Sequence, residues 1–297
     1  MELRELKYFL AIAKEQNISK AAESLFVTQP SLSRQMQHLE KEIGKQLFVR
    51  GARKITLTDT GLLLQKRAEE ILALYDKTIA ELTQQSGSIA GDIHIGSGES
   101  YAIEEVARVA KQLQSRCPDI KFHFFSGDTH AVIEQLDKGL IDFGILVEPA
   151  DVSQYNSLKL RQKDTWGVLM RKDSPLAKQT TVSPQDLYDK PLIRSKHAIN
   201  TTELSDWFRC DPTRLNVVAT YNLIYNASIL VRERLGYAIG LDKLINTPGD
   251  SDLCFRPLEP KLQSSLIVAW KNKQIFSTAS QLFLDMLKQE HNNPLAL

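Results

Sequence analysis

Cysteine is scarce in this chain, with three residues among 297, at positions 117, 210 and 254. This odd, widely spaced set argues against a disulfide framework, and no C-x-x-C pair predicts a zinc site. Long apolar runs are also missing: no stretch approaches the roughly 18 consecutive apolar residues of a membrane span. The N-terminal segment MELRELKYFL lacks the apolar core and cleavage site of a signal peptide. We therefore expect a cytoplasmic protein.

Signatures of catalysis are missing as well. The G-S-G at 96–98 has no third glycine to complete a dinucleotide fingerprint, because Tyr101 stands in that place. No serine has glycine both two residues before and two residues after it, which excludes a nucleophile elbow. The six histidines (38, 94, 123, 130, 197 and 291) show no metal-ligand spacing, and we interpret His94 and His123, which lie in strand patterns, as structural. We predict no catalytic residue, metal or cofactor.

The charge of the chain is unevenly distributed. Residues 1–58 contain ten Lys and Arg against six Asp and Glu, a net charge of +4, which leaves −3 for the remainder. A basic end on a slightly acidic body predicts one part that meets a polyanion and another with a different task. The length, with 42% hydrophobic and 25% charged residues, is typical of about two globular domains, or three if one is small.

Three short helices and a hairpin are predicted in the basic segment. The first helix carries apolar residues at helical spacing, and Ser19 is placed to cap the second. Thr28 or Gln29 opens the third helix, with Pro30 in its first turn. Residues 47–58 contain two β-prone runs around a glycine and three basic residues, which predicts a hairpin lying on phosphates. The apolar positions of the first helix are Leu3, Leu6, Phe9, Leu10 and Ala13.

The third helix divides into an apolar stripe and a polar face. The stripe consists of Leu32, Met36, Leu39 and Ile43, and the polar face of Ser33, Arg34, Gln37 and Lys41. A helix fits the major groove of DNA, and Ser, Gln and Arg suit the donors and acceptors that bases present there. The alternative is a three-helix bundle whose polar face is only solvated.

Residues 3–60 resemble the DNA-binding domain of LysR-type transcriptional regulators. The resemblance rests on LKYFLAIAKEQNISKAAESL, VTQPSLSRQMQHLEKEIGKQLFVR and ITLTDTG, long motifs that depart from the family pattern at Asn17-Ile18, where Gly-Ser is common. It implies promoter DNA as a partner, with base contacts from Gln29, Pro30, Ser33, Arg34 and, as a further candidate, Gln37. It also implies phosphate contacts from Ser31, Arg50 and Lys54, with Thr28 near the DNA backbone.

A long helix follows, capped by Thr58 or Asp59 and running to about Gln85, before S-G-S at 86–88. Its apolar seam consists of Leu64, Ala68, Ile71, Tyr75 and Leu82, with Thr78 in the missing heptad position and Ile79 beside it. Such a seam favours pairing with a second copy of the chain, and the alternative is packing on its own domain. The family resemblance supports dimerisation and implies a tetramer, with RNA polymerase as a candidate partner.

From residue 91 the pattern alternates between strands and helices, predicting a βαβαβ unit up to residue 147 and further strands at 166–171, 192–193, 217–219, 237–241 and 265–270. The order resembles the effector-binding domain of the same family, which has two lobes and folds like a periplasmic solute-binding protein. We place the two crossings between lobes near 161–166 and 264–270. The predicted fold class is α/β: a winged helix-turn-helix domain at 1–58, a linker helix at 59–88 and an effector domain at 91–297. Lobe I comprises about 91–161 and 268–297, and lobe II about 162–267.

Ligands in such sheets bind beyond the carboxyl ends of strands, near helix N-termini. The resemblance implies the same places, including Ser100, Thr129 and Thr201, although each Ser or Thr alone fits an N-cap better than a ligand contact. Glu99 and Glu148 add negative charge, so we hypothesise a small polar effector carrying an amine or another cationic group. The predicted effector residues are Ser97, Glu99, Ser100, Tyr101, Thr129, Glu148, Ser195, Thr201, Thr202, Asn222 and Asn226.

The predicted function is a LysR-type regulator that binds promoter DNA as a dimer or tetramer and responds to a small-molecule effector between two α/β lobes. The rival is a solute-binding or enzymatic α/β protein whose N-terminal helices serve only assembly. Cys210 is a candidate redox sensor, but an ordinary packed or exposed thiol is favoured because no second cysteine lies near it.

Overall fold

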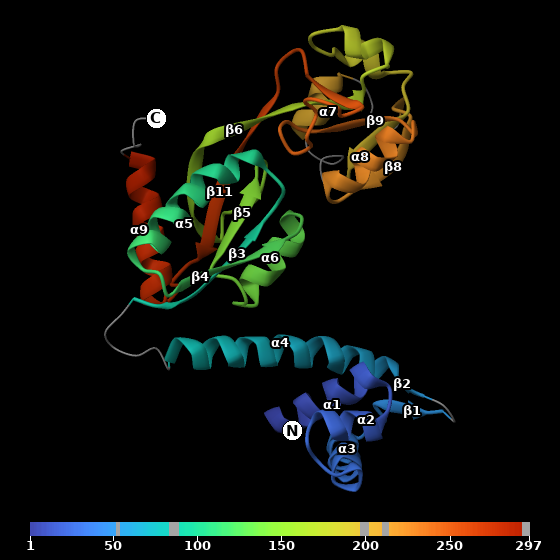
Figure 1. The fold of residues 1–297 in the computed structure, drawn as a ribbon, viewed down its shortest axis with the longest axis vertical. Helices are drawn as coiled ribbons and strands as arrows, with labels where there is room; N and C mark the ends of the chain where they lie inside the picture. The colour runs from blue at the N-terminus through green and yellow to red at the C-terminus, as the bar shows by residue number, and fades with distance from the viewer. Residues whose placement is uncertain (52–53, 83–88, 197–201, 210–213, 293–297) are drawn as a thin grey trace. The chain divides into compact units, whose positions relative to one another are not determined.

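The computed structural model of the protein describes residues 1–51, 54–82, 89–196, 202–209 and 214–292, with only the backbone of Arg50 and Thr202 (Figure 1). The chain forms two compact units, Met1–Gln84 and Gln85–Leu297. None of the described helices is both long enough and apolar enough to cross a membrane.

The N-terminal unit is a winged helix-turn-helix followed by a long helix. Its elements are α1 (Leu3–Glu15), α2 (Ile18–Ser24), α3 (Gln29–Ile43), the antiparallel hairpin of β1 (Phe48–Arg50) and β2 (Ile55–Leu57), and α4 (Asp59–Leu82). The predicted apolar stripes meet in one core, which includes Leu6 and Phe9 of α1, Leu32 and Met36 of α3, and Ala68 of α4. The helix starts predicted for α3 and α4 are confirmed.

The cap predicted for the second helix was wrong. Asn17, not Ser19, is the N-cap of α2, and its side-chain oxygen accepts a hydrogen bond from the backbone N–H of Lys20 at 3.1 Å. Asn17 has the extended backbone typical of an N-cap, so the helix starts at Ile18, two residues earlier than a cap at Ser19 would place it. The departure from the family's Gly-Ser therefore supplies a capping side chain.

The start of α4 is held against the hairpin by close backbone packing. Thr58 caps the helix, because its Oγ1 accepts from the N–H of Gly61 at 3.0 Å and donates to the carbonyl of Gln46 at 2.8 Å. A Cβ at Gly61 would lie 2.2 Å from the carbonyl oxygen of Leu47. Only glycine permits this close approach of the two backbones, by which the start of α4 packs against the hairpin.

Gly61→Ala is therefore expected to lower the unfolding free energy of the N-terminal unit by about 3 kcal/mol, since the added methyl overlaps a backbone atom that cannot move alone. Far-UV circular dichroism during urea unfolding measures the loss of this helical unit. Fluorescence follows the other unit separately, because Trp166, Trp207 and Trp270 all belong to it. The control is Gly98→Ala, whose Cβ meets nothing closer than 3.6 Å. Equal stability of Gly61→Ala and the unchanged protein would contradict this packing argument.

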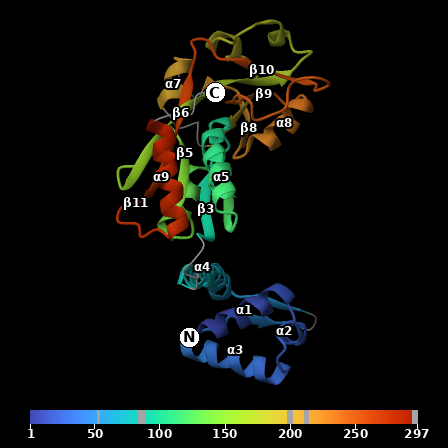
Figure 2. The ribbon, with the colours of Figure 1, turned by 60° about the vertical axis from the view of Figure 1, so that its left-hand side comes forward.

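The C-terminal unit has two lobes. In lobe I, β3 (Gly91–Ser97), β4 (Ile120–Ser126) and β5 (Phe143–Val147) form the predicted parallel sheet in the order β4-β3-β5. Helices α5 (Glu104–Arg116) and α9 (Thr278–Asn292) cover one face side by side (Figure 2), and α6 (Thr129–Asp137) covers the other. A 3-10 turn, Tyr101–Ile103, precedes α5.

Lobe II contains β7 (Leu192–Ser195), β8 (Val217–Tyr221), β9 (Tyr237–Leu241) and β10 (Leu253–Pro257). Helices α7 (Thr202–Phe208) and α8 (Ile224–Arg232) pack into separate apolar clusters of this lobe. Short 3-10 turns lie at Pro175–Lys178 and Pro184–Leu187. The prediction omitted β10, a five-residue strand that ends at a proline.

One long strand, β6 (Tyr155–Arg171), runs through both lobes. It pairs with β11 (Gln263–Lys271) along residues 155–165 and with β9 and β10 along 166–171. Strand β11 also pairs with β5 of lobe I. The prediction began this strand at Trp166, eleven residues too late. Residues 155–165 are mostly polar and lack the continuous apolar run on which the prediction of this strand rested. At the crossing, Trp166 Nε1 donates to Ser264 Oγ at 2.7 Å.

Candidate functional site: a DNA-binding face and an interlobe cavity

The outward face of α3 is polar and exposed. Leu32, Met36 and Leu39 point into the core of the N-terminal unit. The 100° step of a helix places Arg34 and Gln37 on the opposite side, and both are exposed. Thr28, the N-cap, and Gln29, Pro30 and Ser31 are also exposed, whereas Ser33 is half-buried. The first turn of α3 and its outward face thus present donors and acceptors of the kinds that reach base edges.

The hairpin is held at a defined place relative to α3. Glu40, near the end of α3, accepts hydrogen bonds from the backbone N–H groups of Leu47 at 2.7 Å and Phe48 at 3.3 Å. The N–H of Ile55 donates to the carbonyl of Gln16 at 2.9 Å, which ties the second strand to the end of α1. Lys54 is exposed at the start of this strand. The side chain of Arg50 lies outside the described residues.

The predicted seam of α4 divides between two environments. Ala68 and Leu72 are buried against the N-terminal unit, and Leu64 packs beside them. The remaining apolar residues are exposed, from 39% for Tyr75 to 77% for Leu82. We call this exposed surface the apolar face of α4; its residues are Ile71, Leu74, Tyr75, Ile79 and Leu82. Packing on its own unit therefore holds for the buried part of the helix, and pairing of the exposed part with a second copy stays a prediction.

A cavity of about 380 Å³ lies between the two lobes of the C-terminal unit. Lobe I contributes the segments that follow β3, β4 and β5, and lobe II contributes residues around β7, β8 and β9. Apolar side chains from both lobes, including Ile133, Trp166 and Leu244, form much of its wall. Such a volume suits a small metabolite.

The charged groups of the cavity are predominantly acidic. Glu99, Asp128, Glu148 and Glu203 line it together with His130, and none of its described lining residues is Lys or Arg. Two of the carboxylates have protein partners: Asp128 caps α6 through the N–H of Ala131, and Glu148 pairs with Lys159 at 2.6 Å. The described wall therefore favours a ligand with positive charge over an anion.

Glu99 also joins the lobes. Its Oε2 accepts a hydrogen bond from the N–H of Ile224, the first residue of α8, at 2.7 Å. Beside it, burial raises the pKa of Tyr221, and the negative charge of Glu99 raises it further. Tyr221 is neutral and donates its hydroxyl to the carbonyl of Ile239 at 2.7 Å.

Comparison with known proteins identifies the two parts. Residues 86–292 match the family model described as the LysR substrate binding domain, and residues 3–62 match the bacterial regulatory helix-turn-helix protein of the lysR family. The chain belongs to the LysR family. It is a LysR-type transcriptional regulator, with a DNA-binding helix-turn-helix domain and a ligand-binding domain, and not an enzyme.

Curated relatives of this LysR regulator match either nearly its full length or about two thirds of it. The uncharacterized HTH-type transcriptional regulator YvbU of Bacillus subtilis is 28% identical, covering 97% of this chain and 98% of its own. The hydrogen peroxide-inducible genes activator of Pectobacterium carotovorum is 29% identical over 65% of this chain and 64% of its own. The structure of full-length CbnR complexed with target DNA has a TM-score of 0.75 and 19% identity, covering 97% and 99% of the two chains, which supports the fold.

Five of the predicted effector residues line the cavity: Glu99, Thr129, Glu148, Ser195 and Asn222. Four others, Ser97, Ser100, Tyr101 and Asn226, are not among its described lining residues. Thr201 lies outside the described residues, as does the side chain of Thr202; Cys210 is also outside them.

Ser97 and Ser100 serve the backbone of the LysR domain. Ser97 Oγ donates to the carbonyl of Gly98 at 2.7 Å. Ser100 caps the turn that follows it, accepting from the N–H of Ala102 and donating to the buried carboxylate of Asp164. Burial raises the pKa of Asp164, and the hydrogen bond from Ser100 opposes this shift. The N-cap alternative weighed for each Ser and Thr therefore applies to Ser100.

Tyr101 and Asn226 point elsewhere. The ring of Tyr101 lies under the ammonium of Lys243, 4.4 Å from the ring centroid, and Asn226 is exposed on α8. Conversely, the prediction missed His130, Trp166, Glu203 and Tyr221 in the cavity wall. Trp166 lies at the predicted lobe crossing, a position that could have identified it, whereas the other three follow only from how α6, α7 and β8 are placed around the cavity.

Two groups of the described residues bring together side chains that bind metal ions. One is Glu5, His38 and Glu42 on α1 and α3, and the other is Asp92, His94 and His123 on β3 and β4. In the first group the terminal ammonium of Met1 already pairs with Glu42 at 2.5 Å and with Glu5 at 3.9 Å. In the second group the two strand histidines interpreted as structural lie beside each other, and His123 pairs with Asp92.

Proposed function

We propose that residues 1–58 bind promoter DNA through the outward face of α3 and the hairpin, that the helix within 59–88 pairs with a second copy, and that the domain at 91–297 binds an effector. The exposed polar face of α3, opposite a complete apolar core, carries this proposal. Two α3 helices in a dimer would contact two half-sites of a pseudo-palindrome. Binding to DNA places the protein in the cytoplasm, and dimers of dimers and contact with RNA polymerase remain family expectations.

The mechanism is a shift between conformations of the two lobes. Because the cavity is lined from both lobes and Glu99 bonds to α8 across it, an effector bound there favours one arrangement of the lobes over others. The difference between the effector's binding free energies for the two lobe arrangements couples effector binding to the helix-turn-helix domains.

Selection of bound sequences from random DNA tests the DNA-binding proposal directly. The purified full chain is expected to enrich an interrupted palindrome, with affinity that falls steeply as salt rises. Footprinting of the selected sequence at two salt concentrations measures both properties. Absence of enrichment, with cell extract added as a source of effector, would favour the rival role of the N-terminal helices in assembly only.

The effector class follows from the charge of the cavity. Four acidic residues without a described Lys or Arg in the wall support a small ligand with an amine or another cationic group and an apolar portion. A thermal-shift screen of amines, amino acids and dicarboxylates distinguishes the classes, because a ligand that binds only the folded state raises its melting temperature. If only simple dicarboxylates raise it, the proposed class is wrong.

Glu99→Gln and Glu148→Gln are each expected to weaken binding of an amine found by that screen about 10-fold, since hydrogen bonds with charged groups contribute about 1.5–3 kcal/mol. The glutamine oxygen at position 99 can still accept from Ile224, so the change removes charge and preserves the bond between lobes. Calorimetric titration measures the affinity. Glu104→Gln is the matched control, because it removes the same charge from α5 outside the cavity wall. Unchanged affinity in both cavity variants would show that these carboxylates do not contact the amine.

A further inference from the structure

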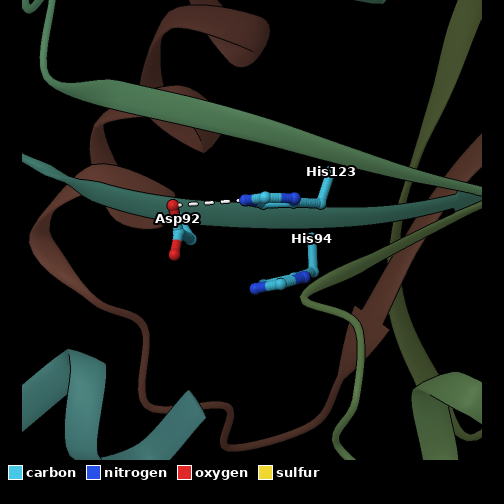
Figure 3. A group of neighbouring side chains, drawn as sticks. All are labelled: Asp92, His94 and His123. Atoms are coloured by element: carbon cyan, nitrogen blue, oxygen red, sulfur yellow. Dashed lines mark ion pairs between the residues drawn. The ribbon is translucent and has the colours of Figure 1, made fainter. Parts of the chain in front are cut away.

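Asp92, His94 and His123 form a compact group in lobe I that the proposed function does not use (Figure 3). His123 Nε2 lies 3.2 Å from Asp92 Oδ1. The imidazole rings of His94 and His123 are stacked, with centroids 4.8 Å apart and planes inclined by 16°. In Figure 3 both imidazole rings extend from their strands toward the side on which Asp92 lies.

Strand register brings these side chains together. Parallel pairing places His94 of β3 beside His123 of β4. Asp92 is two residues before His94, so its side chain projects from the same face of the sheet. Ile93 and Ile95 project from the other face into the core of lobe I. Because the backbones are fixed by the ladder, the group is positioned before any ligand arrives.

The backbone beneath the group is further fixed by Asp142. Its Oδ2 accepts from the N–H of His94 at 2.8 Å, and its own N–H donates to the His94 carbonyl at 2.7 Å. Above the sheet the side chains are accessible, since those of His123 and Asp92 are 50% and 40% exposed. Rigid backbones with accessible side chains allow an ion to enter without disturbing the core.

The chemistry and spacing suit a late first-row divalent metal. Imidazole nitrogen and carboxylate oxygen are ligands of zinc, and imidazole also suits copper and nickel. Ligands about 2.0–2.1 Å from a tetrahedral ion lie roughly 3.3 Å from one another. The His123–Asp92 separation of 3.2 Å already has this value, and the candidate ligand atoms all lie within 4.8 Å of one another. A change in side-chain torsion at His94 would complete the set, with water in the fourth position.

We propose that Asp92, His94 and His123 form a binding site for a divalent transition-metal ion of the zinc class. Asp92 is near the amino-terminal end of β3, and His94 and His123 are the central residues of β3 and β4. The effector cavity is lined by residues that follow the carboxyl ends of these strands, and its lining includes none of the three side chains. Metal and effector therefore occupy separate places in lobe I. This site is independent of the proposed effector, and its presence does not depend on DNA binding.

The positive charge of Lys121 repels a metal ion at the proposed site. Lys121 lies opposite Asp92 in the register, is exposed, and shares the face of His123 two residues along β4. Its positive charge weakens binding of any metal at the group. Lys121→Gln should consequently raise zinc affinity, whereas substitution of the ligands should lower it.

The test is titration of the untagged full chain with zinc near neutral pH, in competition with a chromophoric chelator. One site per chain is expected. His94→Asn and His123→Asn should each lower its affinity at least about 10-fold, since even the outer partners of a metal ligand change affinity about 10–100-fold. His38→Asn is the matched control, because it removes a histidine from the other candidate group. It should leave the affinity of this site unchanged.

Other outcomes decide against the site. Binding that survives both substitutions, is lost in His38→Asn, or occurs only at millimolar zinc would overturn the proposal. Thermal unfolding of each variant without zinc verifies that the fold is retained. If His94→Asn unfolds, the exposed His123 still provides the test, together with the opposite effect of Lys121→Gln. The measurement uses zinc alone, so its result is independent of the effector and of the operator.

Discussion

Arg34→Ala is expected to abolish sequence-specific DNA binding by this LysR regulator while leaving weak binding to any sequence. Arg34 is exposed on α3, opposite the buried Leu32, Met36 and Leu39. A bidentate contact between arginine and guanine contributes about 1–3 kcal/mol of discrimination. Two copies in a dimer double the effect, which corresponds to a loss of roughly 30-fold to 10,000-fold. Fluorescence anisotropy with the selected operator and a scrambled duplex measures both affinities.

Lys54→Ala is the comparison that separates base contacts from phosphate contacts. The exposed Lys54 immediately precedes β2. Its substitution is expected to weaken binding to both duplexes equally and to flatten the salt dependence by about one phosphate contact per copy. Unchanged operator affinity in Arg34→Ala would eliminate α3 as the recognition helix. An equal loss of affinity for both duplexes in Arg34→Ala would instead mean that Arg34 contacts phosphate and not a base.

Ile71→Asp is expected to convert the dimer into a monomer. Ile71 belongs to the apolar face of α4 and is 40% exposed in the isolated chain. If a second copy covers this face, the substitution buries a charge without a partner, at a cost of about 3 kcal/mol or more. The dimer dissociation constant then rises at least about 100-fold. Analytical ultracentrifugation over a concentration series measures it, and operator affinity should fall with it because each monomer reaches one half-site.

The matched control is Ala73→Asp. Ala73 is exposed and lies 200° around the helix from Ile71, so it places the same charge on the opposite surface. It should leave the dimer intact, and circular dichroism shows whether either variant disturbs α4. A dimer that tolerates Ile71→Asp would mean that the apolar face of α4 is not the interface.

Much of the N-terminal unit was predictable from residues close together in the chain. The apolar stripe and proline of α3, and the glycine and basic residues of the hairpin, specify local structure by periodicity and by backbone preference. The error at Ser19 was also local, since two side chains compete to cap one helix and only the backbone conformation at Asn17 decides between them. It was not predictable which apolar residues of α4 pack on the N-terminal unit and which are exposed, because helical periodicity alone does not say what covers each residue.

In the C-terminal unit the alternating pattern predicted the strands and helices, but it did not predict the cavity wall. The rule that ligands bind beyond strand ends selected loops that line the cavity, including those of Glu99, Thr129 and Glu148. Within a loop, one side chain lines the cavity, as that of Glu99 does, and its neighbour bonds within the following turn, as that of Ser100 does. That choice depends on side-chain directions set by the turn, and sequence spacing does not contain it.

The sequence by itself determined the helix-turn-helix, its outward polar face, the α/β character of the second unit and the LysR resemblance, because each follows from contiguous residues or periodic apolar positions. Only the tertiary structure decided which residues meet across the two lobes, how far β6 extends, and that His94 lies beside His123. These depend on strand register and on crossings between distant segments of the chain. The pattern of one strand fixes which of its faces is buried, but which segment it pairs with, and at what offset, depends on the packing of distant strands.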